Sequence, residues 1–379
     1  MLNRTIQMSP PIPYDKWLLL TVGGLMCIGL LMVASASIVI SDNPFFYFYR
    51  QSFSIILGII SGIFVVQFKV SNWEKIGGFA LLGIILLLIL VLIPGLGHSV
   101  NGSSRWIGFG FFKIQISELA KLSIVIYLAG YLYRRNSEIK NKLKGFLKPI
   151  LILVVVSYLL LLEPDFGGTV VIIITALGMM FLAGMRVKHF LTLLGLVFIG
   201  LAVIAVSEPY RIARLTSFLN PWASPFNSGY QLTQSLIAFG RGGWFGVGLG
   251  NSIQKLFYLP ESYTDFLFAI IAEELGLIGM LFIISLFCIL FWRIFSIGKR
   301  AQLLGRHFSG FLSYGVGIWL VIQFAVNIGV NSGILPTKGL TMPLISYGGS
   351  SMLINCIALA LILRIDYENR MVALGLYNE

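Results

Sequence analysis

Apolar runs about as long as a bilayer is thick recur along the whole chain, and they constrain its fold more than any other feature. A helix needs about 20 apolar residues to cross the hydrocarbon core. The sequence predicts ten such spans, with approximate ranges 17–40, 52–68, 77–96, 114–133, 146–163, 167–184, 189–206, 264–292, 308–332 and 343–363. Only 11% of the 379 residues are charged, whereas about 25% is usual in a soluble domain. We therefore predict an all-α polytopic membrane protein that forms a single domain over 1–379.

Basic residues between the predicted spans are unevenly distributed, and this distribution predicts the orientation of the chain. With the N-terminus in the cytoplasm, the inner segments hold 18 of the 27 lysines and arginines, the outer segments hold 8, and Lys121 lies within a span. The positive-inside rule then places both a leader over 1–16 and a tail over 364–379 in the cytoplasm. The net charge of +12 therefore reflects topology and attraction to anionic lipid, not a nucleic-acid surface.

One predicted outer segment, over 207–264 between the seventh and eighth spans, is much longer than the others. It contains eleven aromatic residues and the glycine-rich run GRGGWFGVGLG over 240–250. That aromatic content is too high for a disordered linker. We expect the segment to fold back over the membrane surface as short helices and turns.

Signatures of several common enzyme classes are missing. The sequence has no GxxxxGK[ST] phosphate loop, no HExxH and no GxSxG, which are the motifs of P-loop proteins, zinc proteases and α/β-hydrolases. The three cysteines, Cys27, Cys288 and Cys356, each lie alone in an apolar run. They lack metal-ligand or disulfide spacing, so we interpret them as small buried hydrophobic residues.

Polar residues inside predicted spans mark positions where helices interact or where a site lies. Glu118 and Lys121 are separated by one helical turn and can neutralise each other as an internal ion pair. Gln323, Asn327 and Asn331 recur every four residues on the ninth span. This stripe predicts hydrogen bonds between helices.

Four carboxylates lie in the stretch FYLPESYTDFLFAIIAEELG, over 257–276. Glu273 and Glu274 diverge by about 100° on a helix, so we predict that both are buried and pair with basic or amide groups on neighbouring helices. Glu261 and Asp265 lie at the predicted outer interface, where both can reach water and a substrate. A helix N-cap is the alternative role for Asp265.

The outer loops also hold a carboxylate in a tight turn and a set of cations. Asp165, in LLEPDFGG, either caps the next helix or takes part in a site. The cations are Arg105, Arg211, Arg214, Arg241, Lys255 and Lys338. Cations beside one carboxylate suit an anionic lipid headgroup and above all a pyrophosphate, because the cations hold the diphosphate and the acid handles a proton.

Five motifs identify a family when they are taken together and in order. They are NGSSRWIGFG, EPDFGG, NSGYQLTQSLIAFGRGGWFGVGLG, YLPESYTDFLFAIIAEELG and GILPTKGLTMPLISYGGSS. They resemble signatures of the SEDS family (shape, elongation, division and sporulation) over nearly the whole chain. The last motif, with Lys338, resembles the cell-division branch, since the rod-shape branch usually has no lysine at that position.

The resemblance implies an activity, a location and partners. It implies ten transmembrane helices and a peptidoglycan glycosyltransferase that polymerises lipid II on the outer face of the bacterial cytoplasmic (inner) membrane, at the division septum. A class B penicillin-binding protein would supply the transpeptidase, together with other division proteins. No cofactor is implied with certainty, and the sequence shows no dedicated cage for a metal, although a divalent cation could help to hold the pyrophosphate.

The resemblance also implies roles for individual residues. The essential acid of the family falls on Asp265, its arginine–tryptophan pair on Arg105 and Trp106, and its division-type lysine on Lys338; Asp165, Glu261 and Ser346 match further motif positions. Many relatives have a histidine where this chain has Tyr263, so we assign no imidazole to the chemistry.

These residues lead to a mechanistic hypothesis in which Asp265 is the general base. It would take the proton from the 4-hydroxyl of the acceptor sugar, while Lys338 and Arg105 hold the leaving pyrophosphate and Trp106 packs against sugar or lipid. A lipid II flippase, an elongation-type polymerase and a scaffold for the division transpeptidase are the alternatives.

Overall fold

The computed structural model describes residues 14–94, 97–100, 103–109, 112–141, 144–206, 216–337 and 339–376. Each of the ten predicted spans is a helix: α1 (Lys16–Ser37), α2 (Phe46–Gln67), α3 (Val70–Val91), α4 (Ile116–Arg134), α6 (Lys144–Leu162), α7 (Phe166–Leu182), α8 (Val187–Val206), α11 (Leu267–Leu303), α12 (His307–Asn331) and α13 (Gly349–Ala373). Within the described part of the chain, eight of these are long and apolar enough to cross a membrane. The others, α7 and the stretch Val187–Val197 of α8, are shorter apolar helices.

Helix ends differ from the predicted ends where polar residues continue a helix beyond its apolar run. The helices α2 and α3 begin earlier than the predicted 52 and 77, whereas α11 and α13 end later than 292 and 363. Hydropathy marks the part of a helix that crosses hydrocarbon, so it does not detect a charged last turn such as the one that ends α11 with Arg300.

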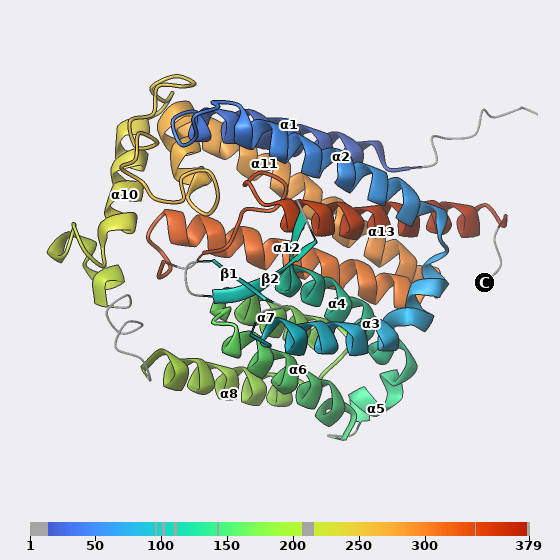
Figure 1. Cartoon of the computed structure of the whole chain (residues 1–379). Helices are drawn as coiled ribbons and strands as arrows, with labels where there is room; N and C mark the ends of the chain where they lie inside the picture. Colours follow the sequence, from blue (N-terminus) through green and yellow to red (C-terminus); the bar gives the residue numbers. More distant parts are fainter. Residues whose placement is uncertain are drawn as a thin grey trace, which may run out of the picture.

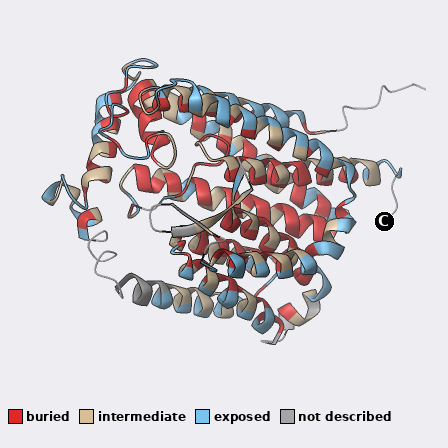
Figure 2. Cartoon of the chain, viewed as in Figure 1, coloured by how far each residue is buried: buried red, intermediate tan, exposed pale blue. Residues whose placement is uncertain are grey.

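The long helices lie side by side and form one bundle (Figure 1). The sheet and α10 (Tyr230–Gly242) lie at one end of the bundle, here called the loop end. The start of α1 and the end of α13 lie at the opposite end, where the rings of Tyr14 and Tyr367 are 5.7 Å apart. Figure 2 shows that the centre of the bundle, with α4, α12 and α13, is mostly buried, while the outer helices expose one face.

A small antiparallel sheet at the loop end was not predicted. It has three strands in the order β1 (His98–Val100), β2 (Ser103–Phe109) and β3 (Phe112–Gln115). Trp106 pairs with Gln115 and Gly108 pairs with Lys113 across β2 and β3. The sheet matters for function because it fixes Arg105 and Trp106 beside the start of α4.

The predicted ion pair inside the bundle is confirmed. The Lys121 ammonium donates to Glu118 and to Gln323, both at 2.8 Å. Trp319 donates to the same Gln323 oxygen at 2.9 Å. This network joins α4 to α12 in the buried centre of the molecule.

The described part of the long segment before α11 contains α10, the short 3-10 helix Pro221–Ala223 and turns; 207–215 lie outside the described residues. Its glycine-rich run packs against a break in α11 at Gly276, where φ is +64°. The carbonyls of Glu273 and Glu274 accept hydrogen bonds from Val247 at 3.0 Å and Gly248 at 3.1 Å. A Cβ atom on Gly276 would overlap the backbone of this run, so the glycines permit a close backbone approach.

Candidate active site

A cavity of about 1520 Å³ opens at the loop end of the bundle. Its wall combines the first turns of α2, the strands β2 and β3, the turn between α6 and α7, the residues just before α11 and the segment before α13. Among the predicted site residues, the wall includes Arg105, Trp106, Asp165, Glu261 and Asp265. Segments that are far apart in the sequence therefore meet at one place.

Asp265 lies just before α11 and is free of any capping role. The N-cap of α11 is Phe266, with no side-chain cap, so the alternative that Asp265 caps this helix is wrong. Its backbone carbonyl accepts hydrogen bonds from Asn327 and Asn331 of α12, both at 2.9 Å. These amides hold the main chain and leave the side chain to face the cavity, where a Cβ atom on Gly339 would lie 2.5 Å from Oδ2.

The surroundings of Asp265 favour its neutral form. Desolvation and the nearby charges of Glu261 and Asp165 raise its pKa, the Arg105 guanidinium lowers it, and the result is a pKa of about 7. Desolvation is the largest of these effects. A carboxyl group with this pKa exchanges protons readily near neutral pH, as a general base must.

Glu261 lies on the exposed rim of the cavity, in a turn where its φ is +56°. Its carboxylate accepts a hydrogen bond of 2.6 Å from Thr264. The turn brings this second negative charge close to Asp265. Glu261 therefore acts on Asp265 electrostatically and raises its pKa.

Arg105 lies on β2 and bridges to the turn between α6 and α7. Its Nε donates to the carbonyl of Glu163 at 2.9 Å, and a terminal nitrogen donates to the carbonyl of Pro164 at 2.5 Å. The guanidinium is thus held by main-chain oxygens and keeps its full charge for the cavity. Trp106, next along the strand, lines the cavity as well.

Asp165 has both of the roles that its sequence left open. It is the N-cap of α7 and accepts a hydrogen bond from the amide of Gly168 at 2.9 Å. It also lines the cavity.

The preceding acid, Glu163, was not singled out as a site residue. Its side chain is buried, and neither carboxylate oxygen has a hydrogen-bond partner among the residues described. Desolvation and the charge of Asp165 raise the pKa of Glu163 to about 8. The EPD motif was the only sequence signal for this group.

Ser346 is the one described residue of the predicted set that does not line the cavity. Ser346 is buried; its hydroxyl accepts from the amide of Met342 at 3.0 Å and its carbonyl accepts from Gln51 at 3.2 Å. It therefore shapes the segment before α13. Lys338 lies outside the described residues, although its neighbour Gly339 lines the cavity.

Two of the cations predicted to lie in outer loops have structural partners. Arg241 donates to Glu273 at 2.6 Å and Lys255 to Glu274 at 2.8 Å, so the prediction that these glutamates pair is confirmed. The same pairs remove Arg241 and Lys255 from the set of candidate pyrophosphate ligands. Arg211 and Arg214 lie outside the described residues.

Tyr263, at the position where the resemblance leads one to expect a histidine, lies in a cluster of aromatic rings. The ring of Tyr263 packs at 4.5 Å from that of Tyr47 and at 5.7 Å from that of Tyr347. Of these three rings, that of Tyr347 lines the cavity. Sequence reasoning did not single out Tyr47 or Tyr347, since aromatic residues at a membrane interface are common.

Within the described residues, no group of three histidine, cysteine, aspartate or glutamate side chains forms a metal set. The acids that line the cavity are Glu118, Asp165, Glu261 and Asp265.

Comparison with known proteins agrees with the motifs. The model of the cell cycle protein family that joins FtsW, RodA and SpoVE matches residues 16–371. A Legionella pneumophila protein named "Probable peptidoglycan glycosyltransferase FtsW" is 56% identical over 373 residues, covering 97% of this chain and 95% of that protein. A Coxiella burnetii protein of the same name is 55% identical over 359 residues, with coverage of 94% and 96%.

Two solved structures share the fold. One, described as "Structural coordination of polymerization and crosslinking by a peptidoglycan synthase complex", superposes with a TM-score of 0.79 at 27% identity and covers 95% of this chain and 99% of that chain. The rod shape determining protein RodA of Thermus thermophilus gives a TM-score of 0.71 at 26% identity, with coverage of 94% and 98%.

Proposed function

The chain belongs to the FtsW/RodA/SpoVE family of cell cycle proteins, and we propose that it is a peptidoglycan glycosyltransferase that polymerises lipid II. One observation carries the assignment of the site. The Asp265 carboxyl, with a pKa of about 7, faces a cavity of about 1520 Å³, and no described residue donates a hydrogen bond to it. A carboxylate kept free in this way is available to a substrate.

In the proposed reaction, Asp265 accepts the proton of the acceptor 4-hydroxyl while that oxygen attacks the anomeric carbon of the donor. The bond from that carbon to the diphosphate oxygen breaks, and polyprenyl diphosphate leaves from the opposite face. A diphosphate leaving group needs charge neutralisation more than protonation, so one carboxylate and nearby cations suffice. The paired acids of glycoside hydrolases are not needed.

We assign Arg105 to the leaving diphosphate, because its guanidinium reaches the cavity beside Asp165 and acts electrostatically on Asp265. Lys338 is proposed for the same role from the motif. Trp106 is proposed to pack against sugar or lipid, and Glu261 and Asp165 to set the field around the base. A divalent cation could share the neutralisation of the diphosphate.

The protein is a multi-pass membrane protein of the bacterial division machinery. We propose that the loop end faces the outer side of the cytoplasmic membrane, that both termini are cytoplasmic and that the protein works at the septum. A class B penicillin-binding protein is the proposed transpeptidase partner, with other division proteins around it. The fold shared with a structure described as a peptidoglycan synthase complex supports this partnership.

The test is lipid II polymerisation by the purified protein with its cognate class B penicillin-binding protein, in the presence of moenomycin to block class A synthases. Wild type should make glycan strands, and Asp265→Asn should lose about 10²-fold or more of that activity because the base is gone. Asp42→Asn, the same change at an exposed loop position outside the cavity wall, is the matched control.

Near-normal turnover by Asp265→Asn in an intact complex would contradict the assignment. A wild-type complex that makes no polymer would direct the test to a flippase, measured by headgroup labelling of lipid II in vesicles. Normal division in cells that carry Asp265→Asn would instead indicate a scaffold.

A further inference from the structure

Two cations in the wall of the cavity have no acidic partner among the residues that the structure describes. Arg50 lies on the first turns of α2 and Lys113 lies on β3, and both side chains are exposed and line the cavity. Among the residues that the structure describes, neither has a carboxylate within ion-pair distance. The Arg50 guanidinium lies over the ring of Phe46, 5.5 Å from its centroid. Glu118, the carboxylate that shares this wall, is already neutralised by Lys121 at 2.8 Å.

The two cations flank one turn, the residues that lead into α13. Next to Arg50 in the chain, Gln51 accepts a hydrogen bond from the amide of Gly348 at 3.4 Å. On the other side, the hydroxyl of Ser350 donates to the carbonyl of Lys113 at 3.1 Å. The two elements that carry these cations, α2 and β3, are thus tied to neighbouring residues of a third segment.

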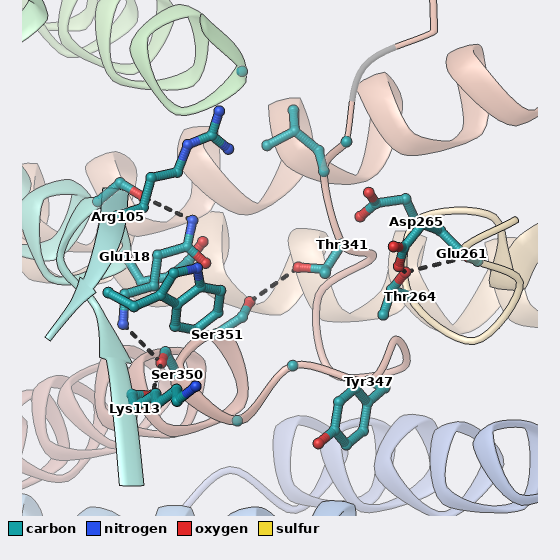
Figure 3. Close-up of a pocket in the computed structure, with 18 of the residues that line it drawn as sticks. Arg105, Lys113, Glu118, Glu261, Thr264, Asp265, Thr341, Tyr347, Ser350 and Ser351 are labelled. Carbon is teal, nitrogen blue, oxygen red and sulfur yellow. Dashed lines mark hydrogen bonds between the residues drawn. The ribbon is translucent and has the colours of Figure 1, made fainter. Parts of the chain in front are cut away.

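This place is separate from the one assigned to the leaving group. In Figure 3, Lys113 and Tyr347 lie in the lower part of the view, and Arg105 and Asp265 lie in the upper part, at opposite edges of the cavity. Thr341 and Ser351, whose hydroxyls are 3.4 Å apart, lie between them. Lys113 therefore marks a cationic position in the cavity wall apart from that of Arg105.

Polymerisation of lipid II requires two lipid diphosphates at once. The donor loses its diphosphate at the reacting anomeric carbon, beside the base. The acceptor keeps its diphosphate, which lies at the far end of the disaccharide from the attacking hydroxyl. The cavity of about 1520 Å³ exceeds the roughly 300–1,000 Å³ of a site for one small ligand, so it has room for both headgroups.

We propose that Arg50 and Lys113 bind the diphosphate of the acceptor lipid II, and that Arg105 serves the donor. The proposal rests on the proposed polymerase function. It assigns the two substrates to opposite sides of the cavity, with the acceptor sugar extending from the Arg50–Lys113 pair towards Asp265. Diphosphate recognition by two cations from different elements follows the usual chemistry of phosphate sites.

The test compares Arg50→Gln/Lys113→Gln with wild type in the complex, reconstituted in phosphatidylcholine vesicles. A preformed glycan strand that still carries its lipid diphosphate is supplied at saturation as the donor, and labelled lipid II is titrated as the acceptor. The double variant should raise the KM for lipid II at least about tenfold, with kcat within about threefold. Lys75→Gln/Lys299→Gln removes two exposed cations at the opposite end of the bundle and should change neither constant.

A second measurement separates the two diphosphate positions. Undecaprenyl diphosphate, the leaving product, should inhibit the double variant as strongly as wild type and should inhibit Arg105→Gln more weakly. An unchanged KM in a double variant with wild-type thermal stability would overturn the proposal. So would weakened product inhibition in that variant at an unchanged KM, since the pair would then belong to the donor.

Anionic phospholipid is the other source of a phosphate group at this position. If the pair binds phospholipid headgroups, the variant and wild type will differ only in vesicles that contain phosphatidylglycerol, and the acceptor assignment is wrong. If wild type makes no polymer under any of these conditions, the proposed function itself fails, which is a distinguishable result.

Discussion

Two carboxylates near the start of α11, Asp265 and Glu274, have opposite surroundings. Glu274 is fully buried and accepts hydrogen bonds from Ser35 at 2.8 Å and from Lys255 at 2.8 Å. Asp265 faces the cavity, and no described residue donates to its carboxyl group. The comparison separates two uses of a carboxylate in a membrane protein: one enclosed by donors holds a segment in place, and one left open can exchange a proton.

The buried glutamates Glu273 and Glu274 also help to position Asp265. Glu273 accepts from Arg241, from the hydroxyl of Ser252 and from the amides of Ile253 and Gln254. These bonds fix the segment that runs over the break in α11 and returns to the cavity. A reactive side chain is most precise when its support is rigid, so the buried glutamates contribute to the site without touching it.

The largest expected effect on stability comes from breaking the enclosed pair. Lys255→Met leaves Glu274 buried without its cation and should destabilise the protein by about 3–5 kcal/mol. Adding Glu274→Leu should recover much of that loss, because an apolar pair has no charge to desolvate. Thermal unfolding of the purified complex measures both.

The control for this prediction is Arg134→Gln, which breaks the exposed ion pair with Glu74, 3.3 Å long. It should change stability by no more than about 1 kcal/mol. If Lys255→Met costs no more than this surface variant, the distinction between enclosed and open carboxylates fails.

The sequence predicted the bundle well because length and hydropathy carry that information directly. The same reasoning predicted that Glu118 would pair with Lys121 and that Glu273 and Glu274 would find partners, since an unpaired charge in a membrane is costly. It missed β1–β3, because this glycine-rich stretch lacks the clear alternation of apolar and polar residues that predicts a strand. It also missed the break at Gly276, which depends on contact with the distant run at Gly246.

The site was predictable as a set of residues but not as a geometry. The motifs named Asp265, Arg105 and Asp165, and the cavity wall includes all three. What the sequence could not supply is the side of the cavity on which each lies, because that depends on how separate elements pack. Arg50 and Lys113 illustrate the point, since neither lies in a distinctive local pattern.

The open carboxylate should control the pH dependence of the reaction. Because the pKa of Asp265 is raised to about 7, its basic form is lost as pH falls through that value. Acceptor kcat/KM should then decrease by about tenfold per pH unit below about 7. Arg105→Gln removes a positive charge that favours the carboxylate form of Asp265. It should therefore move the acidic limb of the pH profile, where kcat/KM falls, to higher pH.

Measurement of kcat/KM from pH 5.5 to 8.5, roughly three units around the expected pKa, checks both statements. Lys75→Gln, a change of charge at the opposite end of the bundle, should leave the limb in place. A flat profile, or a limb that Arg105→Gln moves to lower pH, would show that Asp265 is not the titrating base.

The smallest expected effect concerns Asp165, which combines the two uses of a carboxylate. As the N-cap of α7 it accepts from Gly168, so Asp165→Ala should cost about 1 kcal/mol of stability, whereas Asp165→Asn keeps a capping oxygen and should cost less. Both variants remove a negative charge that raises the pKa of Asp265, so both should move the acidic limb to lower pH by a similar amount. Thermal unfolding of the two variants measures the helix-capping role of Asp165, and their pH profiles measure its electrostatic effect on Asp265. If the acidic limb moves in Asp165→Ala but not in Asp165→Asn, its position depends on stability and not on charge. Asp165 would then act on the base only by holding α7 in place.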